Sequence, residues 1–479
     1  MSPRRFLPRR LMAWACLPLM AACAAPSMPP TEAPVTPPPD WYAPVPHDGS
    51  LRELGQWWSS LQDPVLVELI VAAENVSGTL AQARSRIEQA RATRIGAGAA
   101  LGPLEDGGAN ASRGFSQETL GVATIVQGTV QASWETDIFG GNRAARDAAQ
   151  ARFEGAQAQW HDARVSVAAE TADRYFTLRS CRDTLAVMRD DAASRAETAR
   201  LTTLTAEAGF QSPANAELAR ASSAEAAGRL TQQQGQCDIE VKTLVGLTDL
   251  PEPMLRAKVV GAPAGTVTPF AVPVVPAELL AQRPDVYALE RDVAAASFDV
   301  GTAEAAKYPS LRLNGSIGGG MVRTQGVGTT SATWSIGPVE LSVPIFDGGR
   351  RAADADAARA RYEEAVALYR AKVRDAVKEV EQALVTLQSA IDRSSDAQAA
   401  ANGYRAAFLA AEASYRSGLG SLIEMEDVRR TALAAQMNVV SLQRERISAW
   451  ISLYRAMGGG WNRPGSPSPT STQAGASPR

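Results

Sequence analysis

The sequence predicts a mainly α-helical fold with a membrane β-barrel, built from a strand and long-helix repeat that occurs twice. The segment 334–350, WSIGPVELSVPIFDGGR, reads as an alternating strand that runs through a Gly-Gly turn into a long helix. About two hundred residues earlier, 134–143 reads WETDIFGGNR and is followed by a second long Ala-rich run. Beyond the leader no stretch of eighteen or more apolar residues occurs, so a membrane crossing must use strands.

The helical run after each Gly-Gly turn is too long for an ordinary globular core. From Gly141 to Gly209 there are 68 residues, and from Gly348 to Gly418 there are 70. A continuous helix of that length would measure about 100 Å, so we expect antiparallel helices that bundle laterally. The runs end in matching motifs, AGFQS and SGLGS, and we expect tip turns there at Gly209, Ser212, Gly418 and Ser421.

The amino terminus reads as a lipoprotein signal peptide over residues 1–22. Arginines precede an apolar run that ends in MAAC at 20–23, which resembles a bacterial lipobox. We therefore expect a covalent lipid on Cys23; ordinary cleavage beside an incidental cysteine is the alternative. By the same resemblance, Ala24 implies sorting to the outer membrane. Residues 23–50 contain nine prolines and should form an extended, lipidated tether.

The first repeat is expected over 51–255, with strands at about 109–138 and long helices on either side. Asp63 followed by Pro64 marks a helix start. The segment 129–138 alternates, with a polar face and an apolar face formed by Val130, Ala132, Trp134, Thr136 and Ile138.

After a linker over 256–275, the second repeat is expected over 276–461, with a helix at 276–307 and strands at about 310–345. A Gly-rich loop is expected at 318–328. The strand phase slips by one residue at Gly337-Pro338, as a β-bulge would cause.

The helices of the second half show heptad periodicity, which predicts coiled-coil packing. In the helix after Arg350 the repeating positions are Val366, Val373, Val380 and Leu387, with Tyr369, Ala376, Ala383 and Ala390 three residues further on. In the last helix they are Leu433, Val440, Ile447 and Tyr454. The Ser- and Pro-rich tail at 462–479 is expected to be disordered.

Composition argues against nucleic-acid binding and catalysis. The net charge of −3 leaves no basic excess for nucleic acid. The two histidines, His47 and His161, belong to no metal-ligand cluster or nucleophile–base pattern, so we expect no metal, no other cofactor and no enzyme activity. The GSIGGG segment at 315–320 superficially resembles a phosphate loop, but no helix start follows it, and we expect a barrel loop.

Cys181 and Cys237 are the cysteines of the chain body, and their mean position is residue 209, where the first long helix should turn. Residues equidistant from the turn of an antiparallel hairpin face each other. Because the compartment outside the inner membrane is oxidising, we expect a disulfide between them. Two separate buried thiols are the alternative.

Four strands per chain cannot close a membrane barrel, which needs at least eight. Two chains would give eight strands and an interior filled by side chains, whereas three would give twelve and leave a lumen. The polar face of 129–138 favours the wider pore, so we expect a homotrimer. Trp134 and Trp334 belong to the apolar phase of their strands and are expected to face lipid.

Four phrases in chain order, DPVLVELI, QRPDVYALERDVAAASFDVGTAEAAKYPSL, PIFDGGR and LYRAMGGGW, carry a family resemblance. The chain from Trp57 to Trp461 resembles the TolC-like outer-membrane factors, specifically the NodT-type RND efflux lipoproteins. This resemblance implies a homotrimeric, twelve-stranded outer-membrane β-barrel, in contact with lipid, that continues into a periplasmic α-helical barrel. It also implies a passive export duct for drugs or other small molecules, docked to an inner-membrane RND-type transporter through a periplasmic adaptor protein.

In the resembled family, two acidic residues one helical turn apart surround the closed periplasmic entrance, and here they fall on Glu424 and Asp427. Their i, i+3 spacing places both on one helix face, and such acidic rings attract cations. Glu426 adds a charge where the family usually has Leu, and Gly420 stands where some members keep a latch-forming Arg. A solvated acidic helix start is the alternative.

Two other classes compete with this interpretation. A structural coiled-coil envelope lipoprotein without channel activity is compatible with the heptads, but it has no use for paired strands at matched positions. A periplasmic adaptor would need lipoyl-like β-domains around one hairpin, and the sequence shows none.

Overall fold

The computed structural model describes residues 27–35, 37, 57–117, 121–261, 282–324 and 326–463. The predicted signal peptide, Cys23, His47 and nearly all of the tail lie outside the described residues. In chain order the elements are α2 (Trp57–Ser60), α3 (Pro64–Val76), α4 (Gly78–Ala99), β1 (Leu104–Ser116), β2 (Gly121–Thr136), α5 (Gly141–Glu207), α6 (Pro213–Thr248), α7 (Glu252–Gly261), α9 (Pro284–Ala305), β3 (Ser310–Thr324), β4 (Val327–Ser342), α10 (Arg350–Arg416), α11 (Leu422–Ala456) and η3 (Gly458–Gly460).

The chain divides into two compact units. Unit 1 comprises Met1–Pro34, Ser85–Gln157 and Ala288–Ala371; unit 2 comprises Val35–Arg84, Ala158–Tyr287 and Lys372–Arg479. Each unit takes segments from both halves of the sequence. All four strands fall in unit 1 and both hairpin tips fall in unit 2.

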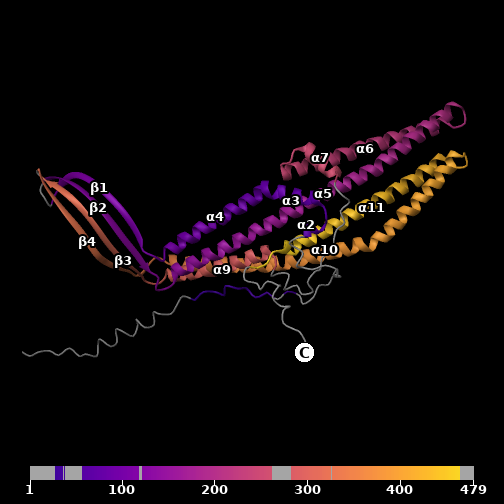
Figure 1. Cartoon of the computed structure of the whole chain (residues 1–479). Helices are drawn as coiled ribbons and strands as arrows, with labels where there is room; N and C mark the ends of the chain where they lie inside the picture. Colours follow the sequence, from indigo (N-terminus) through magenta and orange to yellow (C-terminus); the bar gives the residue numbers. More distant parts are fainter. Residues whose placement is uncertain are drawn as a thin grey trace, which may run out of the picture. The chain divides into compact units, whose positions relative to one another are not determined.

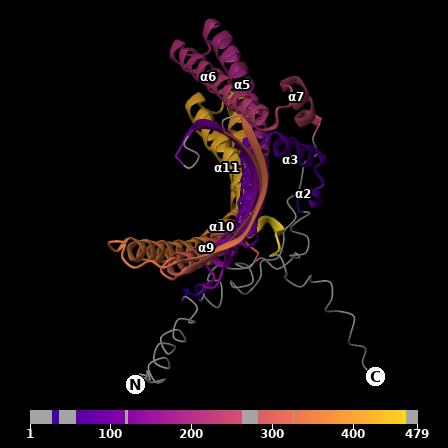
Figure 2. The same cartoon turned by 90° about the vertical axis from the view of Figure 1, so that its left-hand side faces the viewer.

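In unit 1 the strands form one antiparallel sheet in the order β1-β2-β3-β4, and Figure 2 shows that it is strongly curved. The pairing of β2 with β3, for example Val130 with Ile317, joins the two halves of the chain. The strands predicted at about 109–138 run over 104–116 and 121–136, and those predicted at about 310–345 run over 310–324 and 327–342. The first strand starts earlier because its polar, Gly-rich residues pair continuously with β2.

The prediction of a Gly-rich loop at 318–328 is wrong, because most of these residues belong to β3 and to the start of β4. Glycine is needed there for close packing. A Cβ atom on Gly318 would lie 2.8 Å from Thr129 Cγ2 on the neighbouring strand. Side chains are therefore absent where adjacent strands approach each other in a curved sheet.

The predicted bulge at Gly337-Pro338 is confirmed. Leu313 pairs with Val339, whereas Gly315 pairs with Ile336, so one residue of β3 faces two residues of β4. The extra residue restores the phase that keeps the apolar side chains of β4 on one face.

The helix predicted over 276–307 is shorter in the structure. Residues 276–281 lie outside the described part, and α9 begins at Pro284 and ends at Ala305. Proline is favoured at the first helical position, where its missing N–H costs no hydrogen bond. In unit 1, Ala294 and Ala295 of α9 pack with Ala151 of α5.

Unit 2 contains two helical hairpins, one from α5 and α6 and one from α10 and α11, visible in Figure 1. The helices turn at Gly209 and Gly418, whose φ angles of +80° and +76° favour glycine. Apolar residues of the predicted seam are buried in the core, among them Val373, Ala376, Val380, Ala383, Leu387 and Ala390.

The amino end of α3 is fastened to this core by one buried carboxylate. Asp63 caps α3 by accepting a hydrogen bond from Leu66 N, as the predicted helix start requires. Its other oxygen accepts from the Tyr175 hydroxyl at 2.7 Å and from Arg179 at 2.9 Å. Burial, and then the bond to Asp63, raises the pKa of Tyr175 above its ordinary value.

The predicted linker at 256–275 starts too early, because α7 continues to Gly261. Leu255 and Val259, four residues apart, are buried in the core of unit 2. Glu252 at the helix start pairs with Arg256 at 2.8 Å. An apolar face and this ion pair stabilise a helix where composition indicated a linker.

Candidate functional site

The sheet of unit 1 has one apolar and one polar face. Residues paired across antiparallel strands point to the same side. Trp134 pairs with Leu313, and Ile317 pairs with Trp334, so both tryptophans share a face. The apolar face is formed by Ala109, Ala111, Phe115, Val122, Val126, Val130, Trp134, Leu311, Leu313, Ile317, Met321, Trp334, Ile336, Val339 and Leu341.

The opposite face is mainly polar, with Leu104, Ile125, Val322 and Val327 as apolar exceptions. Its side chains include Asp106, Asn110, Ser112, Gln127, Thr129, Gln131, Ser133, Glu135, Arg312, Asn314, Ser316, Thr329, Ser331, Thr333, Ser335 and Glu340. Charged exceptions on the apolar face, Glu105, Arg113 and Arg323, lie near strand ends, where long side chains reach a polar interface. The pattern suits lipid on one side and water on the other.

The apolar face is uncovered in the single chain. Trp334 is 75% exposed and Ile336 is 92% exposed. β1 and β4 are the outer strands of the sheet, each with one unpaired edge. Exposed edges and a large apolar surface both require a covering partner, which lipid and neighbouring copies would supply.

The hairpin tips in unit 2 have equivalent constructions. Ser212 caps α6 by accepting from Asn215 N, and Ser421 caps α11 by accepting from Glu424 N. The residue after each tip glycine is apolar and exposed, Phe210 by 84% and Leu419 by 87%. The four predicted tip residues thus lie at the turns or at the first helical caps.

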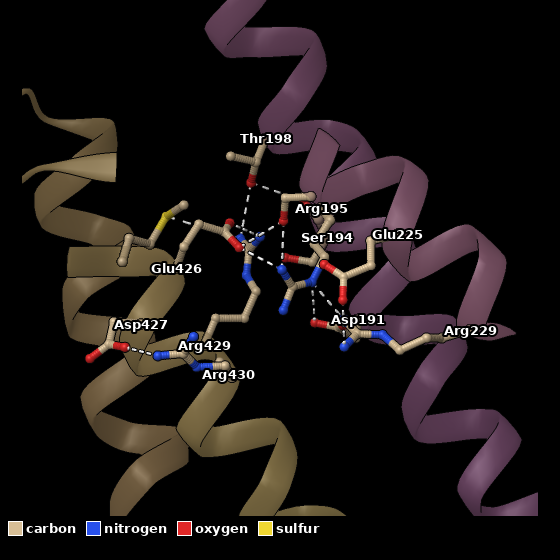
Figure 3. A network of polar contacts seen from close by, with 12 residues as sticks. Asp191, Ser194, Arg195, Thr198, Glu225, Arg229, Glu426, Asp427, Arg429 and Arg430 are labelled. Atoms are coloured by element: carbon tan, nitrogen blue, oxygen red, sulfur yellow. Dashed lines mark hydrogen bonds and ion pairs between the residues drawn. The ribbon is translucent and has the colours of Figure 1, made fainter. Parts of the chain in front are cut away.

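The structure separates the three predicted gate residues into two groups. Glu424 and Asp427 are exposed on α11, and Asp427 pairs with the exposed Arg430. Glu426 instead points toward α5, where it meets Arg195 (Figure 3). The two exposed carboxylates remain candidates for an acidic ring, whereas Glu426 joins the two hairpins within the chain.

A buried polar network surrounds Glu426, as Figure 3 shows. Its carboxylate pairs with Arg195 at 2.6 Å and with Arg429 at 2.5 Å. Arg195 also pairs with Asp191 of α5 at 2.9 Å, and Arg429 donates to the Thr198 hydroxyl at 2.9 Å. Burial lowers the pKa of Arg429, and the Glu426 carboxylate opposes that shift. The network ties the first hairpin to the second near their tips.

Sequence analysis did not identify Arg195 and Arg429 as links between the hairpins, because the partners they contact across the hairpins, Glu426 and Thr198 respectively, are each 231 residues away in the chain. A further link nearer the tips joins the hydroxyls of Thr202 and Tyr415 at 2.7 Å. Farther from the tip of the first hairpin, Cys181 of α5 and Cys237 of α6 form a disulfide with a Cα–Cα distance of 5.6 Å.

The described residues contain no group of three or more His, Cys, Asp or Glu residues that could hold a metal ion. No single described helix is both long and apolar enough to span a membrane; α3 and α4 satisfy that test only as a pair bent by 51°.

A curved sheet joined in one chain to long helical hairpins is a fold that this chain shares with solved outer-membrane channels. The fold matches the Campylobacter jejuni CmeC outer membrane channel with a TM-score of 0.77 at 21% identity, covering 90% of this chain and 95% of that one. The chain belongs to the outer membrane efflux protein family, whose sequence profile matches residues 69–248 and 275–459.

Individual relatives agree with this assignment. The chain is 32% identical over 439 residues to the pyoverdine export outer membrane protein OpmQ of Pseudomonas putida, covering 88% of this chain and 91% of that protein. It is 26% identical over 435 residues to nodulation protein T of Rhizobium leguminosarum bv. viciae, covering 88% of each. The predicted family is therefore confirmed, and the chain is an outer-membrane efflux component.

Proposed function

We propose that three copies of the chain form a passive export duct across the outer membrane. The two-faced sheet with unpaired edges carries this proposal. Joining β1 of one copy to β4 of the next would pair the edges, place the apolar faces against lipid and enclose a polar lumen. A coiled-coil spacer protein would have no use for such a sheet.

The partners follow from the family and from the exposed tips. A periplasmic adaptor that links the duct to an inner-membrane RND-type transporter would dock on the hairpin ends, where Phe210 and Leu419 offer apolar surface. Transported solutes are small molecules, with selection by the transporter rather than by the water-filled duct. We also propose that Cys23 carries a lipid that anchors the amino terminus in the same membrane.

Quenching of tryptophan fluorescence tests which face of the sheet meets lipid. In protein reconstituted with brominated lipids, we expect Trp134 and Trp334 to be quenched, because both belong to the apolar face. Replacing both by Phe should remove the bromine-sensitive part of the emission. Quenching by water-soluble iodide alone would contradict the proposed orientation.

Bilayer recordings test both the duct and the acidic ring. We expect the wild type to conduct ions, and replacement of Glu424 and Asp427 by Ala to weaken cation selectivity and block by multivalent cations. Trimer assembly should persist, because both side chains are exposed. Unchanged selectivity and block would place the gate elsewhere, whereas a wild type that never conducts would contradict the duct itself.

A further inference from the structure

Two arginines lie in one row across the apolar face of the sheet. Arg113 of β1 pairs with Thr124 of β2, and Thr124 pairs with Arg323 of β3. Residues paired across antiparallel strands point to the same side, so the two arginine side chains flank that of Thr124. Neighbouring strands lie about 4.8 Å apart, which puts the Cα atoms of the two arginines about 10 Å apart. Side chains as long as arginine can therefore converge on one bound group.

On this face of the described sheet, no acidic side chain lies next to the two arginines. Both are exposed, and within the described part of the chain neither guanidinium has an ion pair or a hydrogen bond. Glu105, on the same face, precedes Arg113 by eight residues along β1, which is about 27 Å at the rise of a strand. The adjacent rows are apolar and contain Ala111, Val126 and Met321 on one side and Phe115 and Val122 on the other. An anion that neutralises the pair on this face must come from outside the sheet.

The row of arginines lies toward the end of the sheet that carries both hairpin turns. One turn joins β1 to β2 and the other joins β3 to β4, and Arg113 and Arg323 are close to these turns. The strand ends that connect to helices all lie at the opposite end of the sheet (Figure 1). Because the helices of the proposed duct extend into the periplasm, its hairpin end faces the cell exterior.

The length of the strands places the arginines at the level of lipid headgroups. Leu311 and Arg323 lie on the same face of β3 and are twelve residues apart, which is about 41 Å along the strand. At a barrel tilt of about 40°, this length gives a height of about 31 Å, whereas the apolar band of an outer-membrane barrel is about 25 Å tall. If that band begins near Leu311, the arginines lie beyond it, where a lipid-facing arginine costs little free energy.

We propose that Arg113 and Arg323, with Thr124 between them, bind a phosphate group of the glycolipid that forms the outer leaflet of the outer membrane. The orientation of this site rests on the proposed duct. Guanidinium groups bind phosphate oxygens through paired, charge-assisted hydrogen bonds, and the Thr124 hydroxyl adds a donor between them. The apolar row on the membrane side, which includes Val126, would meet the acyl chains of the same lipid. Each copy of the chain would then carry one lipid-phosphate site on its outer rim.

Native mass spectrometry of the full-length protein in detergent tests this site, with bisphosphorylated lipid A as the probe. The wild type should retain lipid A, and Arg113→Ala/Arg323→Ala should weaken its binding about tenfold or more, because hydrogen bonds to a charged group are lost. Arg113→Lys/Arg323→Lys keeps both charges but not the forked donor geometry, so its affinity should be intermediate. The matched control, Arg361→Ala/Arg370→Ala, removes two exposed arginines from α10 of the same unit and should bind like the wild type.

Equal affinity of the wild type and Arg113→Ala/Arg323→Ala for lipid A would overturn the site. Removing both phosphates from lipid A should weaken its binding to the wild type as strongly as the alanine substitutions do; undiminished binding would mean that only acyl chains are recognised and would also overturn it. Inorganic phosphate should not compete at concentrations comparable with lipid A, and competition would refute the assignment to a lipid.

Conductance in planar bilayers separates this site from the duct. Arg113→Ala/Arg323→Ala should conduct like the wild type, because both arginines lie on the face opposite the polar one. A wild type that conducts but does not retain lipid A would contradict the site alone. A wild type that never conducts would contradict the duct, and with it the orientation on which the site depends.

Discussion

Replacing Glu426 by Ala is expected to destabilise the packing of the first hairpin on α11 by about 3–5 kcal/mol, the range for removing one partner of a buried ion pair. Arg195 and Arg429 both contact this carboxylate, and they are only 6% and 3% exposed. In the variant, Arg195 would keep Asp191, while Arg429 would keep the neutral Thr198 hydroxyl. The buried guanidinium of Arg429 would thus lose its carboxylate partner.

The expected readouts are faster hydrogen exchange near the tips of both hairpins and a larger conductance, because the network joins the hairpins close to the entrance that we propose. Glu426→Gln should have a smaller effect, since the amide oxygen still accepts a hydrogen bond. A double-mutant cycle with Arg195→Ala would isolate the interaction between the two side chains.

Glu445→Ala is the matched control on the same helix. Glu445 of α11 pairs with Arg393 of α10 at 2.6 Å, but the two side chains are 37% and 51% exposed, respectively, so loss of this ion pair should cost at most about 1 kcal/mol. If Glu426→Ala and Glu445→Ala changed stability, exchange and conductance equally, the network would have no special role in holding the hairpins together.

The sequence predicts those parts of the fold that depend on local pattern. Strand alternation and the one-residue slip at Gly337-Pro338 locate both faces of the sheet, because a period of two assigns every side chain to a side. Glycine readily adopts positive φ angles, so glycines that end long helical runs locate the turns at Gly209 and Gly418, where the structure has such angles. The start of β1 and the strand around Gly318 were missed, since strand propensity is low for glycine and small polar residues.

Features that depend on distant partners were not predictable from local pattern. Arg195 and Glu426 are 231 residues apart, and nothing in either neighbourhood signals the other. From the sequence, Glu426 counts as one more exposed acid on α11. The segment 28–33 lacks hydrophobic periodicity, so its contacts with Ser297, Gly301 and Tyr362 become visible only in the structure.

Removal of the disulfide between Cys181 and Cys237 is expected to lower the free energy of unfolding of the α5/α6 hairpin by about 4 kcal/mol. The bond spans a sequence separation of 56, and in the chain-entropy account closing a loop of that length restricts the unfolded chain. Alanine is the preferred replacement at both positions. Each cysteine lies in the apolar core of unit 2, where a serine hydroxyl would add an unsatisfied polar group.

Reductant makes this prediction specific to the bond. Wild-type protein treated with dithiothreitol should approach the thermal stability of the Cys181→Ala/Cys237→Ala variant, and hydrogen exchange should rise between the two positions. The variant itself should not respond to reductant, because its stability no longer depends on a sulfur–sulfur bond. Native protein whose two thiols are both alkylated, with gel mobility unaffected by reductant, would show that the protein carries free cysteines instead.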